Sequence, residues 1–139
     1  MSLAIGDAAG RTGCSVPTIR YYEEIGLIDP AVRAANGRRT YGWRDISRLR
    51  FIRRARDFGM SIGQVRELLA ATTAATPAES CEPAKSVIAA RLNDVIHKRK
   101  ELEELETALT AMLARCAAQC DEQTACCTIF EDISQTDRQ

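Results

Sequence analysis

Six cysteines are the residues of this 139-residue chain most able to do chemistry, and four of them lie within the twelve residues CAAQCDEQTACC. This cluster contains Cys116, Cys120, Cys126 and Cys127. Cys81 lies further upstream and Cys14 near the N-terminus, while the chain has a single histidine, His97. Thiolates bind soft metal ions and act as nucleophiles in redox chemistry. The cluster therefore raises two hypotheses, a metal site and a redox site.

Composition indicates the compartment in which these thiols work. Hydrophobic residues make up 45% and charged residues 27% of the chain, which is typical of a globular protein. No apolar run approaches the ~20 residues needed to span a bilayer, and the first residues lack the pattern of a secretory signal. We therefore expect a cytoplasmic protein with no membrane segment. Because cytoplasmic thiols stay reduced, the cluster favours metal or redox chemistry over a disulfide scaffold.

The net charge of zero hides an asymmetry between the two halves of the chain. Residues 1–70 carry 12 Lys and Arg against 7 Asp and Glu, whereas residues 71–139 carry 7 against 12. The basic residues of the first half are all arginine, whose planar fork suits phosphates and base edges. This pattern predicts a nucleic-acid-binding module joined to an acidic segment.

The first residues predict two short helices separated by a tight turn. Gly13 breaks the first helix, and Ser15 is a good N-cap for the second. Helix, glycine-containing turn and helix make up the helix-turn-helix pattern. The second helix exposes Thr18, Arg20 and Tyr21, which can reach base edges and phosphates. The alternative for this segment is a generic helical hairpin.

A hairpin and an arginine-rich helix follow. Asn36-Gly37 is a strong signal for a two-stranded hairpin, which would carry Arg38 and Arg39 at its tip against a phosphate backbone. Asp45 then caps a helix with an apolar stripe. The arginines around that stripe, which we expect to be mostly solvated, are Arg48, Arg50, Arg53, Arg54 and Arg56.

The stretches TIRYYEEIGLI, NGRRTY, WRDISRLRFIRRARDFGMSI and VRELL together resemble the MerR family of metal- and stress-responsive transcription regulators. The resemblance implies a winged helix-turn-helix dimer on a promoter whose two recognition elements are spaced too far apart. The inducer-bound dimer distorts this double-stranded DNA so that RNA polymerase can use it. The resemblance also implies which residues contact DNA: Thr18, Arg20, Tyr21, Arg39 and Tyr41.

A long helix is predicted from about Ala84 to Leu113. Its apolar residues recur at heptad-like intervals, interrupted at Arg99 and Glu106; they are Ile88, Leu92, Val95, Leu102, Leu109 and Leu113. A lone helix cannot bury such a stripe, so a second copy is the economical partner. In the family, the equivalent helices form an antiparallel coiled coil. The alternative is packing against the chain's own N-terminal domain.

These elements predict an all-α protein with a small β wing. We expect a winged helix-turn-helix DNA-binding domain over 1–70, a connector over 71–83 and a dimerisation helix over 84–115. Residues 116–139 are expected to form a metal-binding loop and a short C-terminal helix.

Cys81 and Cys116 lie at opposite ends of the predicted long helix. Cys81 stands just before the helix, where the N-terminal dipole favours a thiolate. A helix of this length spans roughly 50 Å, so the two thiols cannot meet within one chain. In an antiparallel pair, Cys81 of one subunit lies beside Cys116 of the other. The site is then built across the dimer interface.

The resemblance extends the ligand set. Metal-sensing members have a third cysteine before a short helix, and CTIFEDI matches that pattern from Cys127, or from Cys126 with a loop shorter by one residue. Cys120 falls where zinc sensors place a histidine. Cys81, Cys116 and Cys127 form the minimum set, and Cys120 or Cys126 could supply a fourth thiolate. Such donors favour a soft divalent ion, with Hg2+, Cd2+, Pb2+ and Zn2+ all open.

Two other hypotheses compete with the metal site. A [2Fe–2S] redox sensor of the same family uses the spacing C-x2-C-x-C-x5-C, whereas this chain has C-x3-C-x5-C-C. A cysteine enzyme would need a histidine near a thiol, and His97 is predicted to lie in the middle of the long helix. We therefore do not expect an enzyme. Cys14, in the turn of the helix-turn-helix, is expected to be a small packed residue.

Overall fold

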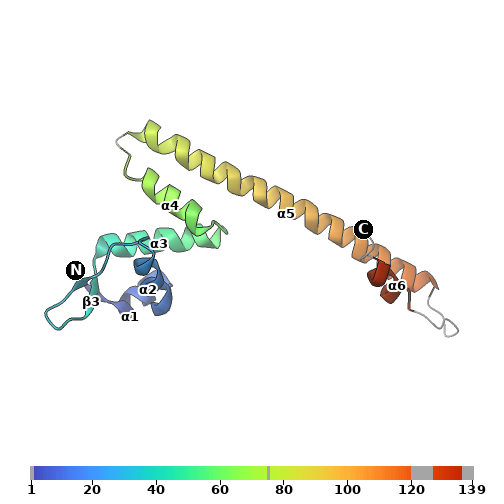
Figure 1. Ribbon diagram of the computed structural model, residues 1–139, viewed down its shortest axis with the longest axis horizontal. Coiled ribbons are helices and arrows are strands. Elements are labelled where there is room, and N and C mark those ends of the chain that lie inside the picture. Colours follow the sequence, from blue (N-terminus) through green and yellow to red (C-terminus); the bar gives the residue numbers. More distant parts are fainter. Residues whose placement is uncertain (1, 75, 120–126, 136–139) are drawn as a thin grey trace. The chain divides into compact units, whose positions relative to one another are not determined.

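The computed structural model describes residues 2–74, 76–119 and 127–135. Figure 1 draws the elements in the colours of the chain. They are β1 (Leu3–Ala4), α1 (Ile5–Thr12), α2 (Val16–Glu24), β2 (Val32–Arg33), β3 (Arg39–Tyr41), α3 (Trp43–Asp57), α4 (Ile62–Ala71), α5 (Pro77–Gln119) and α6 (Thr128–Gln135). The predicted mostly helical fold with a small β wing is confirmed. The chain divides into two compact units, Met1–Arg91 and Leu92–Gln139, which are described in turn.

The turn between α1 and α2 forms as the sequence predicts. Gly13 takes a left-handed conformation with φ of 70°, and its N–H donates to the carbonyl of Ala9 at 2.9 Å. Ser15 caps α2, because its hydroxyl accepts from the N–H of Thr18 at 3.2 Å. A residue with a Cβ is strained at positive φ, so glycine suits position 13. The two helices are therefore positioned by local capping chemistry.

The wing is a sheet of three strands in the order β1-β3-β2, with both pairings antiparallel. The sequence predicts only two of these strands. The third, β1, pairs Leu3 with Tyr41, so the residues before α1 form the other edge. At the tip, Gly37 has φ of 76° and donates to the carbonyl of Ala34 at 2.8 Å. The predicted Asn36-Gly37 hairpin is thereby confirmed.

The core of the first unit lies where α1, α2, α3, α4 and the wing meet. Its largest fully buried side chains are Tyr41, Ile19, Leu27, Ile28, Ile46, Leu49, Ile52 and Val65. The start of α3 differs from the prediction, because Asp45 is not the cap. The N-cap is Gly42, and its N–H donates to the Asp45 carboxylate at 2.8 Å. The helix therefore begins two residues before Asp45, at Trp43.

The long helix α5 begins at Pro77, earlier than the predicted start near Ala84. Thr76 and Glu79 form a reciprocal capping pair: each side chain accepts from the backbone N–H of the other residue at 3.2 Å. Proline is well suited to the first helical position, because its missing N–H would have no partner there. Cys81 therefore lies inside the helix, one turn after its start, and Pro83 is also internal.

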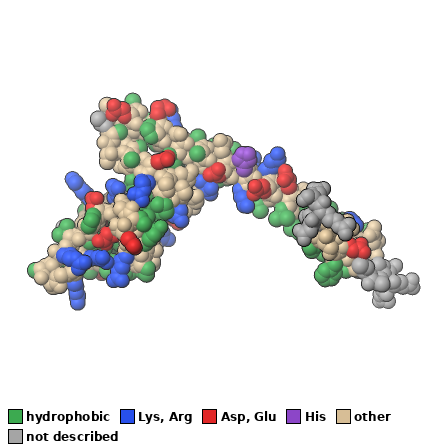
Figure 2. Space-filling model, viewed as in Figure 1, with side chains coloured by type: hydrophobic (Ala, Val, Ile, Leu, Met, Phe, Trp, Pro, Cys, Tyr) green, Lys and Arg blue, Asp and Glu red, His purple; other side chains and the backbone are tan. Residues whose placement is uncertain are grey.

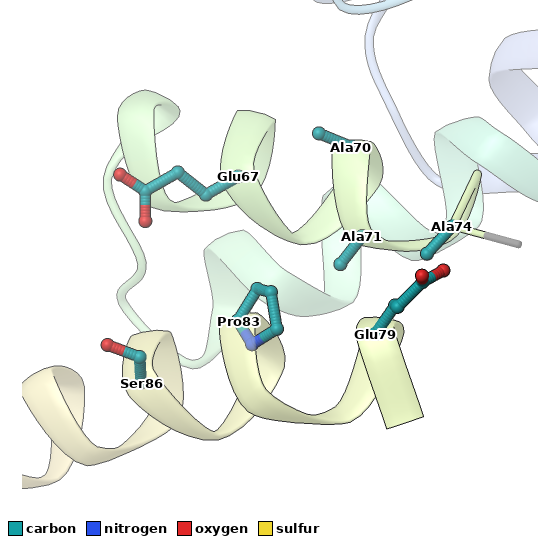
Figure 3. A pocket seen from close by; sticks show the side chains of 7 residues that line it. All are labelled: Glu67, Ala70, Ala71, Ala74, Glu79, Pro83 and Ser86. Atoms are coloured by element: carbon teal, nitrogen blue, oxygen red, sulfur yellow. The ribbon is translucent and has the colours of Figure 1, made fainter. Parts of the chain in front are cut away.

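The first turns of α5 pack against α4 in the same unit. The groove between these helices, of about 510 Å³, is shown in Figure 3 and is lined by Glu67, Ala70, Ala71, Ala74, Glu79, Pro83 and Ser86. Val87 is 4% exposed and belongs to the core. Arg91 donates from Nε to the carbonyl of Phe58 at 2.9 Å. This part of α5 is thus joined to the first unit by the buried Val87 and by the hydrogen bond from Arg91 to the end of α3.

The second unit contains the rest of α5 and the short helix α6. An ion pair between Arg115 and Asp132 joins the two helices. The apolar stripe of α5 is exposed, at 43–67%; its members are Ile88, Leu92, Val95, Ile96, Leu102, Leu105, Leu109 and Leu113. Within the described residues, these side chains are left exposed. None of the described helices combines the length and hydropathy needed to cross a membrane.

Candidate nucleic-acid interface and metal-binding cysteines

The predicted contact residues of α2 reach the surface to different extents. Arg20 is exposed, and the Tyr21 side chain is 48% exposed. Thr18 is half-buried, and its hydroxyl forms a hydrogen bond of 2.7 Å with the hydroxyl of Ser15. Arg20 and Tyr21 are therefore free to meet a ligand directly, whereas Thr18 also takes part in capping its own helix.

Arginines from α2 and the wing surround a concave surface of the first unit. Arg20, Arg33, Arg38 and Arg39, with Ala4 and Ile5, line this surface. Figure 2 shows Lys and Arg side chains gathered over this part of the molecule. The sequence did not single out Arg33, although it pairs directly with Arg39 across the strands. Guanidinium groups converging in this way suit the phosphates of a nucleic acid backbone.

Tyr41 is buried in this structure, which does not favour the expected direct contact with DNA. Its side chain is 0% exposed, and its hydroxyl donates to Oε2 of Glu23 at 3.2 Å. Burial first, and then the neighbouring Glu23 charge, raise the pKa of Tyr41 to about 12. Every second residue of a strand faces the core, and on β3 the inward position falls on Tyr41. This side chain supports the wing from within.

Most of the α3 arginines are not simply solvated, in contrast to the sequence-based expectation. Of the five α3 arginines that were expected to be mostly solvated, four donate to main-chain carbonyls: Arg48 to Leu27 at 2.7 Å, Arg50 to Arg11 at 3.1 Å, Arg53 to Gly13, and Arg56 to Met60 at 2.6 Å. These carbonyls lie at or just after the ends of α1, α2 and α3, where a helix leaves its last carbonyls without partners. The arginines therefore act as side-chain caps.

Cys14 and Cys81 have opposite environments in the first unit. Cys14 is 9% exposed and packs in the core, as expected for a small buried side chain. Cys81 is an exposed thiol on α5. Its accessibility suits a ligand that must meet a metal ion from solution, whereas the buried Cys14 does not.

Two further thiols are described in the second unit. Cys116 lies in the last turn of α5 and is half-buried. Cys127 is also half-buried and stands directly before α6, where its carbonyl accepts from the N–H of Glu131 at 3.4 Å. The first N–H groups of a helix favour a thiolate at this position. Cys120 and Cys126 lie outside the described residues.

The described parts of a single chain do not assemble a metal site. Over residues 2–74, 76–119 and 127–135, no group of three or more His, Cys, Asp or Glu is arranged to hold a metal ion. Cys81 and Cys116 occupy opposite ends of the continuous helix α5, as the sequence predicts. His97 is exposed on the same helix. The three described candidate ligands, Cys81, Cys116 and Cys127, therefore do not form a metal site within one chain.

Comparison with known proteins gives consistent results over nearly the whole chain. The family model described as "MerR HTH family regulatory protein" matches residues 3–72, and one described as "MerR, DNA binding" matches residues 46–112. The transcriptional regulator HmrR of Sinorhizobium medicae is 38% identical, over 94% of this chain and 86% of that protein. ZntR of Escherichia coli is 31% identical, over 94% and 92%.

A solved structure extends the likeness to three dimensions. The transcription regulator PbrR691 of Ralstonia metallidurans CH34, solved in complex with lead(II), has a TM-score of 0.78 and 28% identity. The alignment covers 94% of this chain and 98% of that one. The similarity therefore includes the long helix and the C-terminal segment as well as the helix-turn-helix.

Proposed function

Because the chain belongs to the MerR family of helix-turn-helix regulatory proteins, we propose that it is a metal-responsive transcription activator. It binds promoter DNA in the cytoplasm as a homodimer. A soft divalent ion, Hg2+, Cd2+, Pb2+ or Zn2+, is the inducer. On binding the ion, the dimer distorts the promoter so that RNA polymerase can use it. The observation that carries this proposal is the placement of exposed or half-exposed thiols at both ends of one helix with an uncovered apolar stripe.

The first unit supports the DNA-binding part of the proposal. Arg20 and Tyr21 are exposed on α2, the second helix of the helix-turn-helix, and would enter the major groove. Arg38 and Arg39 of the wing would contact the flanking phosphates, and Arg33 joins them on the same surface. Thr18 remains a proposed contact through its hydroxyl.

The stripe on α5 supports the homodimer. Eight large apolar side chains, each 43–67% exposed, would be costly to leave in water along one helix. Pairing of two α5 helices would bury them against one another. We propose that the pairing is antiparallel, which puts the start of one α5 beside the end of the other.

Antiparallel pairing would complete the metal site. Cys81 of one copy would meet Cys116 and Cys127 of the other, and Cys120 or Cys126 could add a fourth thiolate. All-thiolate sets suit soft ions, with three donors matching trigonal and four matching tetrahedral coordination. Two relatives support this ligand class: a protein of Rhizobium meliloti named heavy metal-dependent transcription regulator 2 is 38% identical, and PbrR691 was solved with lead(II).

A heterodimer of two single mutants tests the shared site. Cys81→Ser and Cys116→Ser are each purified as homodimers and then as a mixed dimer carrying different affinity tags. Bound Cd2+ and Pb2+ per dimer are measured after equilibrium dialysis. Each homodimer should lose tight binding at both sites. The heterodimer should keep half the wild-type stoichiometry, because one of its sites loses both thiols and the other keeps both.

The controls separate this arrangement from its alternatives. Cys14→Ala removes a thiol outside the proposed site and should keep full stoichiometry. A heterodimer that binds no more metal than either homodimer would show that Cys81 and Cys116 do not come together from different chains. A wild-type protein purified with the reddish-brown colour of an iron–sulfur cluster would instead favour the redox sensor.

A further inference from the structure

Glu23, near the end of α2, contacts the wing at two separate places. Its Oε1 accepts from the N–H of Ala31, just before β2, at 3.2 Å. Its Oε2 accepts from the hydroxyl of Tyr41 on β3 at 3.2 Å. The same carboxylate forms an ion pair with Nε of Arg39 at 3.6 Å. One side chain therefore joins α2 to β3 and to the residue that precedes β2.

The surroundings of Glu23 make these contacts stronger than those of a surface carboxylate. Its side chain is only 13% exposed, and the Arg39 side chain is 35% exposed. A half-buried, charge-assisted hydrogen bond is less screened by water than an exposed one. The adjacent Glu24 is exposed, and its side chain makes no hydrogen bond or ion pair among the described residues. The two neighbours therefore carry the same charge in very different roles.

A carboxylate beside a DNA-binding surface has an electrostatic disadvantage. It repels phosphates and partly neutralises Arg39, so it lowers the sequence-independent attraction on which non-specific binding depends. Its geometric effect is of a different kind, because it fixes the distance between α2, which would read bases, and the wing arginines, which would contact phosphates. Phosphate contacts set the register in which bases are read. A rigid link between the two therefore serves discrimination rather than affinity.

We propose that Glu23 is a specificity-determining positioning residue, which holds the wing against α2 so that Arg39 and Arg20 engage DNA in a single register. The proposal rests on the DNA contacts of the proposed function and goes beyond them, since Glu23 itself does not touch DNA. Loosening this link lets the wing reach phosphates in several registers. The affinity for non-specific sites then rises relative to the affinity for the specific site.

The test compares two affinities for each protein. Wild-type protein first selects a preferred duplex from a random-sequence library. Binding constants are then measured at fixed salt for that duplex and for a shuffled duplex of the same composition. In Glu23→Gln, the remaining carbonyl can still accept from Ala31, but the charge that holds Arg39 is gone. We expect the ratio of the two affinities to fall about tenfold, with binding to the shuffled duplex equal to or above wild type.

Glu24→Gln is the matched control, because it removes the same charge from the next residue without breaking a contact. Its affinities should rise slightly and together, leaving the ratio as in wild type. Tyr41→Phe keeps the charge of Glu23 and removes one of its donors, so the ratio should fall less than in Glu23→Gln. Circular dichroism at the assay temperature verifies that each variant is folded.

The outcomes are distinguishable. A purely structural role would lower both affinities of Glu23→Gln by the same factor, as a smaller folded fraction does, and would overturn the inference. An unchanged ratio in Glu23→Gln, or an equal fall in Glu24→Gln, would also overturn it. If the wild type itself binds the selected and the shuffled duplex equally, the proposed sequence-specific regulator fails, and the inference fails with it.

Discussion

Replacing Arg48 with methionine tests whether the α3 arginines support the fold rather than contact DNA. Arg48 is half-buried, and its Nε donates to the carbonyl of Leu27 at 2.7 Å, just beyond the end of α2. Hydrogen bonds from charged donors contribute about 1.5–3 kcal/mol. Water screens part of this at a half-buried site, so the lower end, about 1.5 kcal/mol, applies. Methionine keeps most of the aliphatic stem, which isolates the lost donor.

The expected loss of stability in Arg48→Met is large enough to measure by thermal unfolding. For a domain the size of the first unit, a loss of 1 kcal/mol lowers Tm by about 4–8 °C, so Arg48→Met should lower it by roughly 6–12 °C. Melting must be compared at one protein concentration, because a dimer's Tm depends on it. Operator affinity of the folded protein, and its slope against salt concentration, should stay as in wild type, because the lost group binds a carbonyl and not a phosphate.

Arg54→Met is the control on the same helix. Arg54 is exposed, and its side chain makes no hydrogen bond among the described residues. The free energy of unfolding of Arg54→Met should differ from that of the wild type by less than about 0.5 kcal/mol, so its Tm should change little. The reasoning is refuted if Arg48→Met melts with the wild type while its salt slope falls, since Arg48 would then be a phosphate contact.

Two further predictions concern backbone and titration. Gly13→Ala should destabilise the first unit by more than about 1 kcal/mol, because φ is 70° and the new Cβ would lie on the Arg53 guanidinium. Gly6→Ala, in open space within α1, should instead stabilise it by about 0.5–1 kcal/mol; urea unfolding would contradict the argument if both changes had the same sign. Because the pKa of Tyr41 is raised from 10.0 to about 12, the unfolded state releases this proton first as pH rises. The free energy of unfolding should therefore fall by up to ~1.4 kcal/mol per pH unit between about pH 10 and 12. Tyr41→Phe should reduce that slope, and an identical slope in both proteins would remove Tyr41 as its source.

Local signals in the sequence were sufficient for the helix-turn-helix turn, the cap of α2 and the hairpin of the wing. Gly13, Ser15 and Asn36-Gly37 each act through their own backbone neighbours, so their roles can be predicted without the tertiary structure. The start of α5 was equally local, but it was missed. Thr76-Pro77 with Glu79 three residues after Thr76 is a capping box with proline at the first helical position. The prediction instead began the helix near Ala84, seven residues after its actual start at Pro77.

The remaining errors involve residues whose partners are distant in sequence. The sequence does not distinguish Arg48 from Arg54, because both are arginines on the same helix. Only the tertiary structure brings the carbonyl of Leu27 within reach of Arg48. The resemblance implied a DNA contact for Tyr41, whereas its side chain is buried. Residue type alone does not tell the inward face of a strand from the outward one. The thiols at 120 and 126 lie outside the described residues, so their role as ligands remains a proposal.

The arginine caps also have a consequence for how the first unit folds. Together with Arg66 of α4 and Arg91 of α5, two of these α3 arginines donate to carbonyls far away in the chain: Arg50 to Arg11, Arg53 to Gly13, Arg66 to Ile25 and Arg91 to Phe58. They are separated by 39, 40, 41 and 33 positions. Each can form only after a long loop has closed, and such closure slows folding even when the elements are helical. The unit should thus fold more slowly than its helix content alone suggests, with the guanidinium contacts forming late. A nascent chain would have to emerge as far as Arg91 before the last of them could form.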